Sequence, residues 1–274
     1  MLTMPGAPLP KPENALVLPK GVVPSVIKAV QILDALAESK EPMTLAELTQ
    51  RLKLPKSSVL ALCTSLAMTG MLSRLDSGTY RLGMHLVDLS HAFLSSIDLT
   101  REFVSTWDAL AMLPGEGIVL GVLDGSDVVY VACRNGEQPL GVTYRIGMRL
   151  PASCTATGKA LLSTLPDERI RAIYRTTQLG QLTPHSHTTL KALLKDLHET
   201  RLRGYAIDDE ETREGMCCFG APVFAASGNY AIAAVAVSSL KHPAERGATL
   251  AIPQVVLEFS QALSKRLGAT GKLI

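Results

Sequence analysis

The stretch from Thr44 to Gly83 constrains the fold of this 274-residue chain more than any other part of it. Thr44 and Glu47 have the spacing of a capping box, in which the threonine oxygen accepts the amide of the third helical residue and the glutamate reaches back. A helix is therefore predicted from about Leu45. Its inward residues are Leu45, Leu48 and Leu52.

A second helix is predicted directly afterwards, in PKSSVLALCTSLAMTG at residues 55–70. Pro55 suits a first helical turn, where its missing amide costs nothing, and Gly70 suits a left-handed C-terminal cap. On a helical wheel one face is apolar, and the outer face is short of long side chains. The inward residues are Val59, Leu62, Cys63 and Leu66, and the outward ones are Ser57, Ala61 and Thr64.

The residues on either side complete a recognisable order of elements. Apolar residues from Val26 to Leu36 recur at helical spacing, which predicts a helix ending near Ser39 to Pro42. Beyond Gly70, MLSRL and TYRLG flank Asp76-Ser77-Gly78, a sequence typical of a hairpin turn. Helix, helix, short turn, helix and hairpin predict a winged helix-turn-helix over residues 22–83.

The remainder of the chain predicts a second, α+β domain with an antiparallel sheet. Residues 1–21 are interrupted by prolines and are interpreted as a flexible tail, and residues 84–100 as a linker helix. Strands are expected in GIVLGVLDGSDVVYVACR, PLGVTYRI, residues 205–208, MCCFGAPVF and YAIAAVAVSSL, the last two joined at residues 227–229. Helices are expected at 155–164, 166–174, 189–203 and 243–267. Because hairpins rather than βαβ crossovers link the strands, the domain at 101–268 should be α+β.

The composition excludes some classes of protein. The net charge is +2 with a pI near 8.3, so any nucleic-acid binding requires a local basic surface. Five scattered cysteines show no zinc-finger spacing and suit a reducing cytoplasm. No signal peptide is visible, and YAIAAVAV is too short to span a bilayer. A soluble, cytoplasmic protein without membrane contact is expected.

DNA binding by the first domain is predicted because the second helix of such a fold lies in the major groove. Polar groups in its first turn would hold phosphates, while methyl groups of Ala61 and Thr64 would contact thymine. A helical protein-interaction domain is the alternative. The candidate DNA-binding residues are Thr44, Arg51, Lys56, Ser57, Ser58, Ala61, Thr64, Arg74 and Arg81.

Two features of the second domain resemble chemical sites, a P-loop and a histidine pair. SCTATGKALL fails as a phosphate-binding P-loop, because Ser153 replaces its first glycine and Ala160 its hydroxyl. The segment does offer a helix start made of small residues, Ala156 and Thr157 before Gly158, so its backbone amides could approach a small anion closely. Lys159, one residue into that helix, is expected to point to solvent as readily as to the anion. His185 and His187 have no evident third metal ligand nearby in sequence, so a solvated pair is favoured over a metal site.

One predicted strand carries two adjacent cysteines, Cys217 and Cys218. Adjacent residues of a strand point to opposite faces, so only one of the two thiols can face a ligand. A catalytic thiol at Cys218 or Cys154 would need a base, and no histidine lies near either in sequence. No Gly-x-Ser-x-Gly pattern occurs. The chain is therefore predicted not to be an enzyme, with a cysteine hydrolase as the weakest alternative.

Three separated segments resemble the IclR family of bacterial transcriptional regulators: LAELTQRLKLPKSSVLALCTSL with TYRLG, RLPASCTATGKALLS, and DDEETREGMCCFGAPVFAASGNYAIAAVAVSS. The resemblance covers residues 22–268. It implies a winged helix-turn-helix, a linker helix and a GAF-like effector-binding domain, assembled as homodimers or homotetramers on palindromic double-stranded operator DNA. The positions that match the family's effector contacts are Leu150, Ala156, Thr157, Asp208, Met216, Cys218 and Ser238.

Two positions depart from the family pattern. Ala61 stands where many relatives carry a long side chain, often arginine, in the middle of the recognition helix, and Ala236 replaces a serine two residues before Ser238. The second change suggests an effector less polar than a small keto acid, or differently oriented.

The resulting expectation is a ligand-responsive regulator, repressor or activator, that senses a small organic acid, aromatic acids included, without cofactor or metal. The alternative is a small-molecule sensor that acts through protein contacts without DNA.

Overall fold

The computed structural model describes residues 22–39, 41–95, 98–110, 116–136, 143–226, 230–241 and 246–269. It divides into two compact units, with the boundary between Ser96 and Ile97. The expected tail at 1–21 and the turn at 227–229 lie outside the described residues. Within these ranges no helix is both long and apolar enough to cross a membrane.

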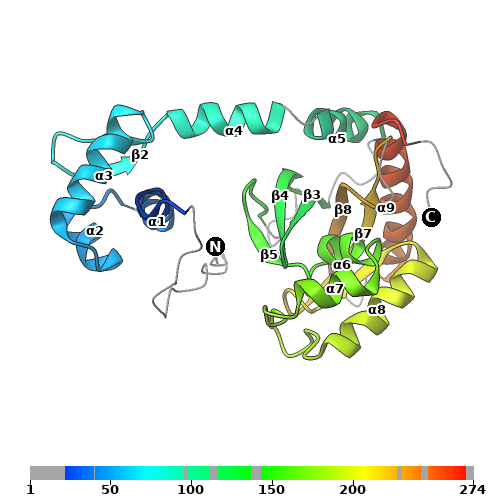
Figure 1. The fold of residues 1–274 in the computed structure, drawn as a ribbon. Helices are drawn as coiled ribbons and strands as arrows, with labels where there is room; N and C mark the ends of the chain where they lie inside the picture. Colours follow the sequence, from blue (N-terminus) through cyan, green and yellow to red (C-terminus); the bar gives the residue numbers. More distant parts are fainter. Residues whose placement is uncertain are drawn as a thin grey trace. The chain divides into compact units, whose positions relative to one another are not determined.

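The first unit has the predicted order of elements (Figure 1). These are α1 (Pro24–Glu38), α2 (Leu45–Leu52), α3 (Lys56–Met68), β1 (Leu72–Arg74), β2 (Tyr80–Leu82) and α4 (His85–Ser95). The capping box is confirmed: Glu47 N donates to Thr44 Oγ1 at 3.2 Å, and Thr44 N donates to Glu47 Oε2 at 2.6 Å. Gly70 has φ +73° and ends the helical region in the left-handed conformation. The winged helix-turn-helix is confirmed.

The core of this unit joins the three helices to the hairpin. Val59 and Cys63 of α3 are fully buried, as expected from the helical wheel, and pack with Ile32 of α1, Leu48 of α2 and Tyr80 of β2. Leu62 and Leu66, also predicted inward, are only partly buried. The burial of one side of α3 leaves its other side as the outer face of the domain.

The second unit contains a six-stranded antiparallel sheet of order β5-β4-β3-β8-β7-β6. Its strands are β3 (Gly117–Asp124), β4 (Asp127–Arg134), β5 (Arg149–Pro151), β6 (Ala206–Asp209), β7 (Met216–Val223) and β8 (Ala233–Leu240). Its helices are α5 (Asp98–Leu110), α6 (Ala156–Ser163), α7 (Asp167–Ile173), α8 (Leu190–Arg203) and α9 (Arg246–Arg266). Both α6 and α9 pack against β7, on opposite sides of it (Figure 1). The α+β class is confirmed.

Two elements differ from the prediction. One helix was expected over residues 84–100, but the structure has α4 there and a second helix, α5, that starts at Asp98. Helix α5 belongs to the second unit, where its Phe103 packs against Phe259 of α9. Of the strand expected in PLGVTYRI, residues 139–142 lie outside the described residues, and residues 143–146 form no strand. The reason lies in Asn135, whose side-chain amide takes both backbone hydrogen bonds of Tyr144 at 2.7 and 3.2 Å, in place of a strand partner.

Two glycines let α6 lie against its neighbours. A Cβ on Gly158 would meet backbone atoms of Ala152 at 2.3 Å, and a Cβ on Gly220 of β7 would meet the carbonyl oxygen of Ala156 at 2.5 Å. Any side chain at either position would therefore push α6 away. The small residues of TATGKA, which predicted a close approach of backbone amides to an anion, serve this close packing.

Candidate functional site

The start of α3 is the part of the first unit best suited to hold an anion. Pro55 is the N-cap and supplies no side-chain hydrogen bond to the amides of the first turn. Lys56 and Ser57 are exposed there and Ser58 is half-buried. Uncapped amides, the helix dipole and an ammonium group together favour a phosphate oxygen.

The middle of α3 presents an apolar outer surface. Leu60 is 44% exposed, and Ala61 and Thr64 are exposed beside it. The Thr64 hydroxyl donates to the carbonyl oxygen of Leu60 at 2.8 Å, and the Ser65 hydroxyl to that of Ala61 at 3.0 Å. Because these hydroxyls are engaged with the helix backbone, the surface can offer methyl groups rather than donors to a base edge. Leu60 was not among the predicted outward residues.

Four further predicted DNA-binding residues surround α3. The hydroxyl of Thr44 serves the capping box, and Arg51 forms an ion pair with Glu38, so neither is free in this arrangement. On the hairpin, the Arg74 guanidinium lies 5.9 Å from the centre of the Tyr80 ring, and Arg81 is exposed. A backbone contact by Arg51 would have to compete with its carboxylate partner.

In the second unit, the antiparallel register aligns three predicted effector residues. Asp208 of β6 lies opposite Cys218 of β7, which lies opposite Ser238 of β8. Met216, two residues before Cys218, points to the same face and packs in one buried cluster with Ala156, at the start of α6. Leu150 of β5 lies against this cluster, which we call the effector cluster.

Two tyrosines belong to the effector cluster and were not predicted. Tyr130 of β4 and Tyr144 pack edge to face, with ring centroids 5.6 Å apart, and both are buried. The Tyr144 hydroxyl shares a hydrogen bond with Ser238 Oγ. Thr157 is 1% exposed, and its hydroxyl has no hydrogen-bond partner among the residues described. The apolar strand sequence DVVYVAC was a signal that could have indicated burial of Tyr130, but only the fold brings Tyr144 to it.

Asp208 connects the effector cluster to the loop that follows β6. Its Oδ1 accepts hydrogen bonds from the amides of Glu211 at 2.8 Å and Thr212 at 3.1 Å, and its Oδ2 accepts from the Thr212 hydroxyl at 2.5 Å. Burial raises the pKa of Asp208 above its usual value, against the effect of these bonds. Movement of this carboxyl would therefore disturb the loop.

The Cys218 thiol is unsuited to nucleophilic catalysis. Burial, followed by the neighbouring Asp208 carboxylate, raises its pKa well above that of a free thiol. A reactive cysteine requires the opposite shift, toward the thiolate. The hydrolase alternative therefore has no support at this position, where Cys218 acts as a small buried group.

Lys159 is placed quite differently from the expectation. It is 0% exposed and forms ion pairs with Asp196 of α8, at 2.6 Å, and with Glu211. Its ammonium group thus points away from solvent and is held by two carboxylates. Desolvation opposes this charge, but Glu211 and Asp196 raise the pKa of Lys159 above its usual value. The lysine is an internal counter-ion rather than a free anion contact.

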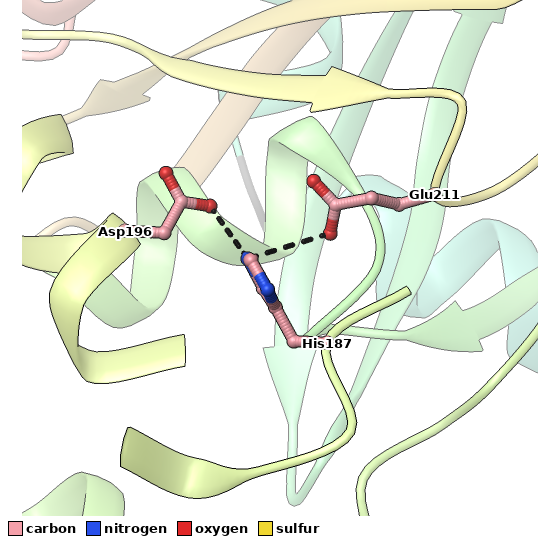
Figure 2. Close-up of side chains that lie close together, drawn as sticks. All are labelled: His187, Asp196 and Glu211. Carbon is pink, nitrogen blue, oxygen red and sulfur yellow. Dashed lines mark hydrogen bonds and ion pairs between the residues drawn. The ribbon is translucent and has the colours of Figure 1, made fainter. Parts of the chain in front are cut away.

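The two loop histidines also differ from each other. His187 lies at the same carboxylates, 3.1 Å from Asp196 Oδ2 and 3.8 Å from Glu211 Oε2, whereas His185 is exposed (Figure 2). Sequence reasoning missed this group because its members lie 9 and 15 residues apart in segments that meet only in the fold.

Both units match models of known protein domains. Residues 25–76 match the IclR helix-turn-helix domain, and residues 91–265 match the bacterial transcriptional regulator IclR C-terminal domain. The HTH-type transcriptional regulator XynR of Escherichia coli is 31% identical over 248 residues, which cover 90% of this chain and 98% of XynR. The Agobacterium tumefaciens repressor BlcR is 39% identical, with a TM-score of 0.58 over 91% of this chain and 99% of BlcR.

A third relative shares the fold at lower identity. It is an IclR homologue from Microbacterium hydrocarbonoxydans, solved in complex with 4-hydroxybenzoate. The two chains are 19% identical with a TM-score of 0.76, covering 90% of this chain and all of the homologue.

Proposed function

Because the chain belongs to the IclR family of bacterial transcriptional regulators, we propose that it controls transcription by binding a palindromic operator as a homodimer or homotetramer. A small organic acid, bound at the effector cluster, alters this DNA binding. The observation that supports the effector site best is the row of Asp208, Cys218 and Ser238 across three strands, facing the start of α6.

The chemistry of the effector cluster suits a ligand that is apolar in its body and polar at its ends. Apolar and aromatic surfaces come from Leu150, Met216 and the two tyrosines. Hydroxyl groups come from Tyr144, Ser238 and the unpartnered Thr157, a small set of polar groups of the kind that orients a ligand. With Lys159 engaged elsewhere, a carboxylate would rely on hydroxyls and on amides at the start of α6.

Aromatic acids are the first class to test. The Microbacterium homologue was solved with 4-hydroxybenzoate, and two tyrosine rings line the corresponding cluster here. A ligand that binds only the folded state raises the melting temperature, so a thermal-shift screen of benzoates, hydroxybenzoates and aliphatic carboxylates tests the proposal. A complete absence of shifts at millimolar concentrations would count against the effector cluster.

The position of a bound acid is tested with Tyr144→Phe, which removes the hydroxyl that meets Ser238. Loss of one hydrogen bond predicts an affinity for the acid lowered by about three- to tenfold. Tyr174→Phe is the control, because it also removes a tyrosine hydroxyl that is shielded from solvent, but one that has no hydrogen-bond partner among the described residues and lies at a different apolar cluster. Equal losses in both variants would indicate a general effect on folding.

DNA binding is tested by mobility shift with duplexes selected from a random pool. Specific complexes should weaken steeply with salt, as phosphate contacts require. A protein that selects no sequence at physiological ionic strength would instead favour a sensor that works through protein contacts. Addition of the identified acid should change the affinity for the selected duplex, because coupling between two sites requires different affinities in two states.

A further inference from the structure

Three side chains from separate segments converge on one point of the second unit (Figure 2). His187 comes from the segment before α8, Asp196 from α8, and Glu211 from the loop after β6. His187 Nε2 lies 3.1 Å from Asp196 Oδ2 and 3.8 Å from Glu211 Oε2, and the three ligand atoms lie within 4.8 Å of one another. We call these three residues the His187 cluster.

The Glu211 carboxylate has one oxygen that nothing in the described protein satisfies. Its side chain is 7% exposed, Oε1 pairs with Lys159, and Oε2 is shielded from solvent without a hydrogen-bond partner. A buried carboxylate oxygen left without a partner is costly, so its presence calls for an explanation. This oxygen is the one that faces His187 Nε2.

We propose that the His187 cluster binds a divalent transition-metal ion of the zinc type. Zinc–nitrogen and zinc–oxygen bonds of about 2.1 Å at tetrahedral angles place neighbouring ligand atoms about 3.4 Å apart. The two separations from His187, 3.1 and 3.8 Å, bracket that value. One imidazole and two carboxylates form a donor set suited to such ions, and a fourth position would remain for water.

The surrounding groups resemble the outer contacts of a metal site. Lys159 holds Glu211 through Oε1, and Arg203 donates to Asp196 Oδ1 at 3.2 Å, so both carboxylates are oriented through their other oxygens. Lys159 also contacts Asp196 Oδ2 at 2.6 Å. Its positive charge weakens the attraction for a second cation, so the site should bind metal less tightly than a closed structural zinc site.

A metal ion here would join three segments of the chain. One of them carries Glu211, whose backbone amide donates to Asp208 of the effector cluster at 2.8 Å. The ion would therefore hold the loop after β6 in place next to that cluster. This consequence is separate from the binding itself, which does not depend on the proposed effector.

The test is titration of the full-length, chelator-treated and tag-free protein with zinc chloride, followed by calorimetry. We expect one ion per chain, and an affinity at least tenfold lower for His187→Ala. His185→Ala is the matched control, since it removes an exposed histidine two residues away and should leave the affinity unchanged. No zinc binding, or equal binding by His187→Ala, would overturn the proposal.

A second pair of variants tests the carboxylate arm. Glu211→Gln should also lower the affinity at least tenfold, whereas Glu210→Gln, at the neighbouring carboxylate that pairs with Lys241, should not. Thermal denaturation verifies folding, and Asp196→Asn replaces Glu211→Gln if the latter unfolds. Because the chain has five free cysteines, cobalt is used as a spectroscopic probe. A sulfur-to-cobalt charge-transfer band would assign the ion to cysteine and contradict the proposal.

Discussion

Replacement of Lys159 by methionine should destabilise the second unit strongly. Methionine has a similar length and fits a buried position, so the main change is loss of the ammonium group that pairs with Asp196 and Glu211. Glu211, at 7% exposure, would then lose its ion pair with lysine, and its charge would stay buried. The perturbation thus leaves an uncompensated carboxylate instead of removing a whole pair.

The size of the effect follows from the burial of the pair. Removal of one partner of a buried ion pair costs about 3–5 kcal/mol. For a domain of this size, 1 kcal/mol lowers the melting temperature by about 2–4 °C. A decrease of about 10 °C in the melting temperature of the second unit is therefore expected.

The assay is thermal denaturation followed by circular dichroism, in the presence of a chelator so that metal ions do not contribute. The matched control is Lys195→Met on the same helix as Asp196, where the lysine is 81% exposed and 3.9 Å from Glu199. An exposed pair of this kind contributes about 0–1 kcal/mol, so the control should shift the transition by at most a few degrees. Equal shifts in the two variants would refute the reasoning from burial.

Adding Glu211→Gln to Lys159→Met provides a second check. The double variant no longer buries an unpaired charge, so it should recover part of the lost stability. An additive loss would mean that the cost of Lys159→Met comes from packing rather than from the unpaired, buried charge of Glu211.

The ion pairs also predict how stability depends on pH. Burial opposes the charge of Asp196, but hydrogen bonds and charges from His187 and Lys159 hold its pKa below the usual 3.8. A lowered carboxyl pKa stabilises the fold above the unfolded value, and this contribution disappears as pH falls through the folded value. The difference in melting temperature between wild type and Lys159→Met should therefore shrink below about pH 4.

Three further predictions concern the effector cluster and the DNA contacts. Gly220→Ala should weaken effector binding at least tenfold in a thermal-shift titration. The added Cβ would meet the carbonyl oxygen of Ala156 at 2.5 Å and push β7 away from α6. An unchanged affinity would show that this contact does not shape the site. Lys56→Ala should weaken binding to all duplexes alike and reduce the slope of log affinity against log salt by about 1, measured by fluorescence anisotropy; a loss confined to one sequence would contradict a phosphate contact. Replacing thymines of the selected operator by uracil should lower the affinity for the operator by about fourfold for each methyl group that contacts Ala61 or Thr64. If uracil had no effect at every position tested, recognition of thymine methyl groups by α3 would be excluded.

Local signals in the sequence were sufficient for much of the fold. The capping box at Thr44, the glycine at position 70 and the turn at 76–78 act within a few residues, so they specify the helices and hairpin of the first unit without long-range contacts. Short apolar runs bounded by turn residues similarly identified β3, β4, β7 and β8. The prediction of a strand around Tyr144 was wrong, because the side chain of Asn135 forms the hydrogen bonds of the Tyr144 backbone that a neighbouring strand would otherwise form.

The candidate sites depended on contacts between residues that are far apart in the sequence. Resemblance to the family identified Asp208, Cys218 and Ser238, but their alignment in one row follows from the register of three strands. The sequence by itself determined the types and periods of the elements and the shortage of long side chains on the outer face of α3. Only the tertiary structure decided that Lys159 is buried between carboxylates and that His187, not His185, meets them. The physical reason is that hydrogen-bonded turns and helices form between near neighbours, whereas the partner of a buried charge is set by which distant segments the core brings together.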